Sequence, residues 1–201
     1  YVWLLNARGL NPPVTSSVGP TWASTGSGAM GYSKGYMKFT PDGTKLICAI
    51  AGQQSIGFGG YNNNTGRIEI YDFDNLTGKL SNPQILNSSN INSTSVGNVS
   101  SVYGIEVAPN GRYLYVSFYI PKWSVSGSYG NDGIWQIDLL AGNAAAMGAS
   151  CQKVVSDFGS PYAAGGMQLG PDGKIWIADN PAPKTPAAAS RNRSRAKVFS
   201  L

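Results

Sequence analysis

The sequence contains no histidine, and this absence removes the commonest catalytic and metal-binding arrangements. Only two cysteines are present, Cys48 and Cys151, and they form no CxxC motif. Without histidine, the Ser-His and Cys-His pairs of nucleophilic catalysis are excluded within the chain. A zinc site is not expected either, because zinc is held by clustered cysteine and histidine side chains. We therefore predict no catalytic residue, no metal site, no cofactor and no enzyme activity.

Charged side chains and long apolar runs are also scarce. Charged residues make up 12% of the 201 residues, about half of the roughly 25% typical of soluble domains. No run of 18 apolar residues exists, so we expect no membrane insertion. A cluster of basic residues lies near the end of the chain, at Arg191, Arg193, Arg195 and Lys197. We interpret it as a solvated loop and expect no nucleic-acid partner, because no basic stripe runs through the rest of the chain.

We interpret the two cysteines from the residues beside them in the sequence. Cys48 lies in the apolar run 46–50 and is expected to be a small buried hydrophobic residue. Cys151 stands near the start of an expected strand. The sequence leaves a disulfide between them open.

An internal repeat organises the chain. Residues 35–49, 103–117 and 166–178 share an alternating limb, a Pro-Asp-Gly or Pro-Asn-Gly turn and a second limb rich in β-branched and aromatic residues. Proline presets φ for a turn and glycine supplies a positive φ, so each copy predicts a β-hairpin. The turn prolines, Pro41, Pro109 and Pro171, are 68 (109 − 41) and 62 (171 − 109) residues apart.

A second pair of strands follows each of the first two hairpins. Residues 67–74 alternate and lead through a turn to 79–86, and residues 133–140 lead through 141–143 to a strand near 152–155. One unit is therefore a four-stranded antiparallel blade of about 60 residues. This pattern predicts an all-β fold, a β-propeller of which the chain covers roughly half.

The blade boundaries follow from the repeat. We expect residues 1–19 to be the outer strands of one blade, 34–90 and 102–157 to be whole blades, and 164–201 to be most of a further blade with a mobile 181–195 loop. Such an arc would leave apolar faces and sheet edges open. Further blades or another chain are therefore expected to complete the propeller.

Several segments together resemble a known group of proteins. GYMKFTPDGTKL, IEIYDFDNLTGKLSNP, YGIEVAPNGRYLYVS, IWQIDLLAGN and MQLGPDGKIWIA follow one another along the chain. In this order they resemble the propeller region of secreted surface proteins of Bacteroidota, which are associated with gliding motility and type IX secretion sorting domains. The resemblance implies a seven-bladed ring, export to the cell surface and a non-catalytic module. The Pro/Ala/Arg segment after Asn180 departs from the pattern.

Aromatic residues fall into two groups. Those at alternating strand positions are expected to be core between blades: Trp3, Trp135, Trp176, Tyr71 and Tyr115. Those in loops are our candidates for binding a protein or glycan partner: Phe58, Tyr61, Trp123, Tyr129 and Trp22.

Two other patterns invite a chemical interpretation. Residues 26–31 spell GxGxxG, but a hairpin and not a helix follows, so we interpret them as a loop. Asp72, Asp74 and Asp138 could serve acid-base chemistry or Ca²⁺ binding. We favour a structural role in turns, which Asp side chains stabilise by bonding to nearby backbone.

The function predicted from these observations is a non-catalytic, extracellular binding or scaffold module used in adhesion, gliding or surface assembly. Two alternatives are kept. The chain could be part of a lactonase-like propeller enzyme whose catalytic residues lie in other blades, or a structural subunit of a larger assembly.

Overall fold

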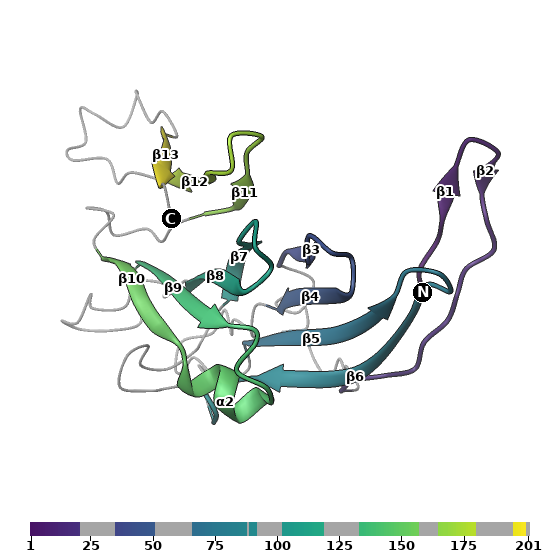
Figure 1. Cartoon of the computed structure of the whole chain (residues 1–201), viewed down its shortest axis with the longest axis horizontal. Coiled ribbons are helices and arrows are strands. Elements are labelled where there is room, and N and C mark those ends of the chain that lie inside the picture. The colour runs from purple at the N-terminus through teal and green to yellow at the C-terminus, as the bar shows by residue number, and fades with distance from the viewer. Residues whose placement is uncertain are drawn as a thin grey trace, which may run out of the picture.

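The computed structural model describes residues 1–20, 35–50, 66–87, 89–91, 102–118, 133–156, 165–179 and 195–199, and these residues form antiparallel sheets (Figure 1). Sheet A holds β3 (Met37–Phe39), β4 (Lys45–Ile50), β5 (Arg67–Asp74) and β6 (Lys79–Leu86). Sheet B holds β7 (Val102–Val107), β8 (Tyr113–Phe118), β9 (Gly133–Asp138) and β10 (Gln152–Ser156). Sheet C holds β11 (Met167–Leu169), β12 (Ile175–Asp179) and β13 (Arg195–Phe199).

The three Pro-Asp/Asn-Gly turns occupy equivalent places in the three sheets. Each closes the hairpin between the first and second strand, and the glycine N–H donates to the carbonyl of the residue before the proline. The N–H three residues after each proline donates to the Asp or Asn side chain of the turn. The glycine-to-carbonyl distances are 2.8 Å for Gly43–Thr40, 2.8 Å for Gly111–Ala108 and 3.1 Å for Gly173–Gly170. The predicted repeat is therefore confirmed at the level of backbone hydrogen bonds.

The turn geometry predicts a specific mutational result at Gly111. Its φ is +71°, a left-handed conformation that costs a side chain about 1–2 kcal/mol. We expect Gly111→Ala to lower the free energy of unfolding by that amount, measured by urea denaturation. Gly111→Asn should cost less, because asparagine adopts this conformation more readily. Equal losses for the two variants would contradict the explanation.

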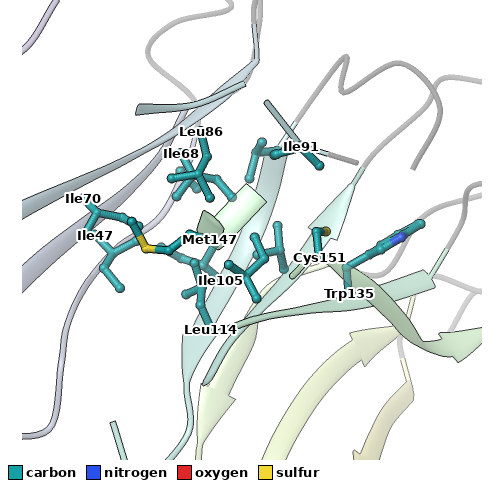
Figure 2. Close-up of a cluster of buried hydrophobic side chains, with 14 of the residues drawn as sticks. Ile47, Ile68, Ile70, Leu86, Ile91, Ile105, Leu114, Trp135, Met147 and Cys151 are labelled. Carbon is teal, nitrogen blue, oxygen red and sulfur yellow. The ribbon is translucent and has the colours of Figure 1, made fainter. Parts of the chain in front are cut away.

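Sheets A, B and C follow one another along the chain, and each packs on the next. We call the face of a sheet that is turned toward the following sheet its trailing face, and the opposite one its leading face. A core cluster joins the trailing face of sheet A to the leading face of sheet B (Figure 2). Its side chains include Ile47, Ile68, Ile70, Ile105, Leu114, Val116 and Trp135. A second cluster joins sheets B and C through Ala108, Tyr115, Ile134, Met167, Ile175 and Ile177.

The first strands of the three sheets, β3, β7 and β11, lie near one another where the three sheets meet (Figure 1). We call them the inner strands. Sheets of antiparallel strands stacked face to face, with their first strands at the centre, are the arrangement of β-propeller blades. The described sheets form no closed ring.

One short helix was not predicted. Helix α2 (Ala144–Ala149) begins after Asn143, whose side chain accepts a hydrogen bond from the N–H of Ala146 at 3.0 Å. Its Met147 side chain is buried in the cluster between sheets A and B (Figure 2). The helix connects β9 to β10 and also packs beside β6, where the N–H of Ala144 donates to the Gln84 side chain at 2.9 Å.

The first residues pair only briefly. Strands β1 (Leu5–Asn6) and β2 (Gly9–Leu10) form a two-stranded antiparallel sheet, and an isolated bridge joins Val2 to Val14. This hairpin projects away from sheets B and C (Figure 1). The division of the chain into blades at residues 19, 34, 90, 102, 157 and 164 stays a prediction.

The expected aromatic core is only partly present. Trp135, Tyr71 and Tyr115 are buried, whereas Trp3 and Trp176 are exposed. The interpretation was wrong for the latter two, because no described sheet covers the hairpin at the start of the chain or the trailing face of sheet C.

Candidate functional site

A polar side chain stands three residues before each turn proline. These residues are Lys38 on β3, Glu106 on β7 and Gln168 on β11. They are cross-strand partners of Ile47, Tyr115 and Trp176. Each therefore points from the trailing face of its sheet, and we call the three together the inner-strand cluster.

The inner-strand cluster links all three sheets. The Nζ atom of Lys38 lies 2.8 Å from Oε2 of Glu106 and 2.9 Å from Oε1 of Gln168, so it bridges sheet A to sheets B and C. The same Glu106 oxygen accepts the backbone N–H of Leu169 on sheet C at 2.8 Å. Its other oxygen accepts the N–H of Val107 at 3.1 Å.

Burial strengthens these contacts. The side chains of Lys38 and Glu106 are 17% and 7% exposed, so solvent screens their ion pair only weakly. Gln168 is exposed, so solvent and dissolved molecules reach the cluster at this residue. Two protons of the Lys38 ammonium are used in the bonds above, and its third has no partner in the described part of the chain. That proton can be donated to an oxygen of a bound molecule.

Two tyrosines lie near the start of inner strands, Tyr36 just before β3 and Tyr103 within β7. The rings of Tyr36 and Tyr103 meet edge to face, with centroids 5.5 Å apart. The Tyr36 hydroxyl reaches sheet C at Gly166, where a Cβ would collide with it. Tyr103 is 39% exposed and offers an aromatic surface beside the inner strands. An aromatic surface near hydrogen-bonding side chains suits a molecule with both apolar faces and hydroxyl groups.

The inner-strand cluster was not predicted from the sequence, although a recurring polar residue before each turn pointed to it. Lys38, Glu106 and Gln168 each interrupt a short apolar strand at the same distance from the turn. Within one hairpin such a residue looks like the solvent-facing member of an alternating strand. Comparison of all three copies would have shown that a polar residue recurs at this position.

The loop aromatic residues proposed as binding residues cannot be placed in this site. Phe58, Tyr61, Trp123, Tyr129 and Trp22 all lie outside the described residues. The same is true of residues 26–31, of residues 181–194 of the loop expected at 181–195, and of the side chains of Arg195 and Lys197. Their roles stay predictions. The loop prediction was wrong at residue 195, because Arg195 begins β13.

Two of the three aspartates, Asp74 and Asp138, have the structural role in turns that we favoured. Asp74 accepts bonds from Leu76 and Thr77 in its own turn, and the Thr77 hydroxyl lowers the pKa of its carboxyl group. Asp138 lies 2.8 Å from Arg112 and bonds to the N–H of Leu140. Asp72 lies inside β5 and is paired at 2.7 Å with Lys45, its cross-strand partner on β4, so its role is an ion pair across the sheet and not a turn. In the residues that the structure describes, no three His, Cys, Asp or Glu side chains gather as metal ligands.

A second buried carboxylate lies on the leading face of sheet A. Glu69 is 3% exposed and accepts the Tyr71 hydroxyl and Nε of Arg67, both at 2.6 Å. Burial, and then the bond to Glu69, raises the pKa of Tyr71 above its usual value. Since both Glu69 oxygens are bonded within the same strand, we assign this group a structural role.

Both cysteines are free thiols, and their environment predicts slow alkylation. Burial, and then the charge of Glu69, raises the pKa of Cys48 to about 11, and burial raises that of Cys151 to about 12. At pH 8 the thiolate fraction is therefore lower in the folded protein than in the unfolded one. We expect iodoacetamide to react at least about tenfold more slowly without urea than with it. Equal rates in the two conditions would contradict this expectation.

In the described part of the chain, no helix is long and apolar enough to span a membrane.

No family model and no curated protein matches the sequence. Solved structures do match. A Pseudomonas aeruginosa periplasmic gluconolactonase is 19% identical, with a TM-score of 0.44 over 74% of this chain and 37% of that one. A glucose dehydrogenase is 15% identical, with a TM-score of 0.46 over 88% of this chain and 50% of that one. Kuenenia stuttgartiensis hydrazine synthase is 18% identical, with a TM-score of 0.44 over 72% of this chain and 36% of that one.

The fold is that of a β-propeller, and its two complete blades, sheets A and B, are four-stranded and antiparallel. The chain spans half or less of the length of each of these three solved chains. The expectation that the chain is not an enzyme is corrected here. That expectation rested on the absence of histidine and on the resemblance of several segments to non-catalytic surface modules. Solved chains that match this one include a gluconolactonase and a glucose dehydrogenase.

Proposed function

We propose that this chain supplies part of the substrate channel of a propeller enzyme, and that the inner-strand cluster binds an oxygen-rich small molecule there. The observation that carries the proposal is the convergence of Lys38, Glu106 and Gln168 from three sheets on one accessible point. Convergent polar groups on rigid strands are the usual construction of a small-molecule site. Additional blades would each add the residue at the same repeat position to this channel.

Lys38 is the residue that we propose to contact the substrate directly. Its ammonium is held by Glu106 and can donate its remaining proton to a carbonyl oxygen. Glu106 is a positioning residue, since it fixes Lys38 and is itself held by the N–H groups of Val107 and Leu169. In lactone hydrolysis, water adds to the carbonyl carbon, the ring C–O bond breaks and the ring oxygen takes up a proton. A cation at the carbonyl oxygen stabilises the negative charge that develops there.

The substrate to test first is gluconolactone, the substrate class named for the similar Pseudomonas aeruginosa protein. Hydrolysis would be followed in a pH-stat with the spontaneous rate subtracted, and binding of the product gluconate by calorimetry. We expect the 201-residue chain to bind gluconate, and Lys38→Met to abolish both binding and any rate enhancement. Lys174→Met removes an exposed lysine of the sheet C turn and should change neither. No binding and no acceleration by the unaltered chain would refute the proposal.

Export to the cell surface and the link to type IX secretion stay predictions that rest on the resemblance of the sequence segments. Detection of the protein in the culture medium of its source cells, without cytoplasmic markers, would support export.

A further inference from the structure

The leading face of sheet A exposes apolar residues at positions that are buried or half-buried in the other two sheets. Met37, Ile105 and Met167 each stand four residues before a turn proline. Ile105 and Met167 are 0% and 2% exposed because they pack on the preceding sheet, whereas Met37 is 64% exposed. Since the three positions are equivalent, Met37 lacks the neighbour that its two counterparts have.

The next residue on the same face behaves in the same way. Phe39 stands two residues before its turn proline and is 48% exposed, while its counterpart Val107 is 1% exposed. Phe39 rests on Phe73 of β5, with ring centroids 4.8 Å apart. Further out on this face, Gly19 lies against Tyr71, which is buried. The open area is therefore the inner part of the face, near β3.

The trailing face of sheet C is open at the complementary position. Trp176 is the cross-strand partner of Gln168, as Ile47 is of Lys38 and Tyr115 is of Glu106. Ile47 and Tyr115 are 0% and 4% exposed, because the following sheet covers them. Trp176 has the same place in the repeat and is 41% exposed.

We propose that a second copy of this chain covers both areas, so that the leading face of sheet A in each copy packs on the trailing face of sheet C in the other. The contact continues an interface that the chain already makes twice, between sheets A and B and between sheets B and C. Sheets A, B and C of two copies make six blades, which lies within the range of about four to eight at which propellers close. A head-to-tail contact of this kind forms a closed ring when its rotation permits.

This inference does not depend on the proposed enzyme activity, and its test measures mass and not turnover. Light scattering after size-exclusion chromatography should give the mass of a dimer for the unaltered chain. Met37→Glu and Trp176→Glu should each give a monomer, because a charge on either face opposes both contacts of the ring. Leu76→Glu places the same charge at a residue that is 93% exposed in the turn between β5 and β6 and should leave the dimer intact.

A mixture of the two variants provides the decisive measurement. The Met37→Glu copy keeps an intact trailing face and the Trp176→Glu copy keeps an intact leading face, so an equimolar mixture should form a heterodimer through one contact. Far-UV circular dichroism of each variant should match the unaltered chain, which separates loss of association from loss of folding. A monomeric unaltered chain, a dimer that both substitutions leave intact, or a mixture that stays monomeric would overturn the proposal.

Discussion

Replacement of Glu106 by alanine should lower the free energy of unfolding by about 3–5 kcal/mol, because it leaves the largely buried Lys38 ammonium without its counter-charge. The Lys38–Glu106 pair is 2.8 Å long, and its side chains are 17% and 7% exposed. The substitution also removes the acceptor for the backbone N–H of Leu169 on sheet C. Urea denaturation followed by circular dichroism measures the loss.

Two comparisons test this explanation. The double variant Lys38→Met, Glu106→Ala should be more stable than Glu106→Ala alone, because it no longer contains an unpaired ammonium. Lys174→Ala breaks the pair with Asp172, in which the two side chains are 46% and 40% exposed, and should leave the urea midpoint close to that of the unaltered chain. Equal effects of Glu106→Ala and Lys174→Ala would show that burial does not decide the strength of these pairs.

Local sequence patterns were sufficient to predict the hairpins. A proline followed by Asp or Asn and glycine fixes the turn through backbone conformation alone, and the structure has the same hydrogen bonds at Gly43, Gly111 and Gly173. Alternation in residues 67–74 likewise predicted β5 to the residue. These features depend on contacts within a few residues, which a sequence displays directly.

The features that the sequence did not reveal depend on contacts between sheets. Lys38 and Gln168 are 130 positions apart, and they meet only when three sheets are stacked. Helix α2 has a capping residue, Asn143, and an alanine run, but six residues are too few to form a stable helix alone. It persists because Met147 is buried between sheets A and B.

The aromatic residues show the same limit. Trp135 and Trp176 both occupy alternating strand positions, and the sequence predicted core for both. Trp135 is 0% exposed because its face meets sheet A, whereas Trp176 faces away from the described sheets. Periodicity shows which face a residue is on, but only the arrangement of sheets shows whether that face is covered.

Replacement of Trp135 by alanine should lower the free energy of unfolding by about 3–5 kcal/mol, as truncation of a fully buried tryptophan typically does. Trp135 is 0% exposed and lies edge to face on Phe118, with centroids 5.0 Å apart. The Lys153 ammonium lies 5.0 Å from the centre of its ring, an attraction that the substitution also removes. The loss would be measured by urea denaturation and by the near-UV dichroism of the folded state.

The matched control is Trp3→Ala, because Trp3 is 50% exposed and contacts only the ring of Tyr1 among the aromatic pairs described. It should change stability by about 0.5 kcal/mol or less. Trp135→Phe should recover part of the loss, since a smaller ring still fills some of the space between sheets A and B. If Trp135→Ala were no more harmful than Trp3→Ala, the sheets would not be held together by this core. The stacking of blades, and with it the inner-strand cluster, would then need another explanation.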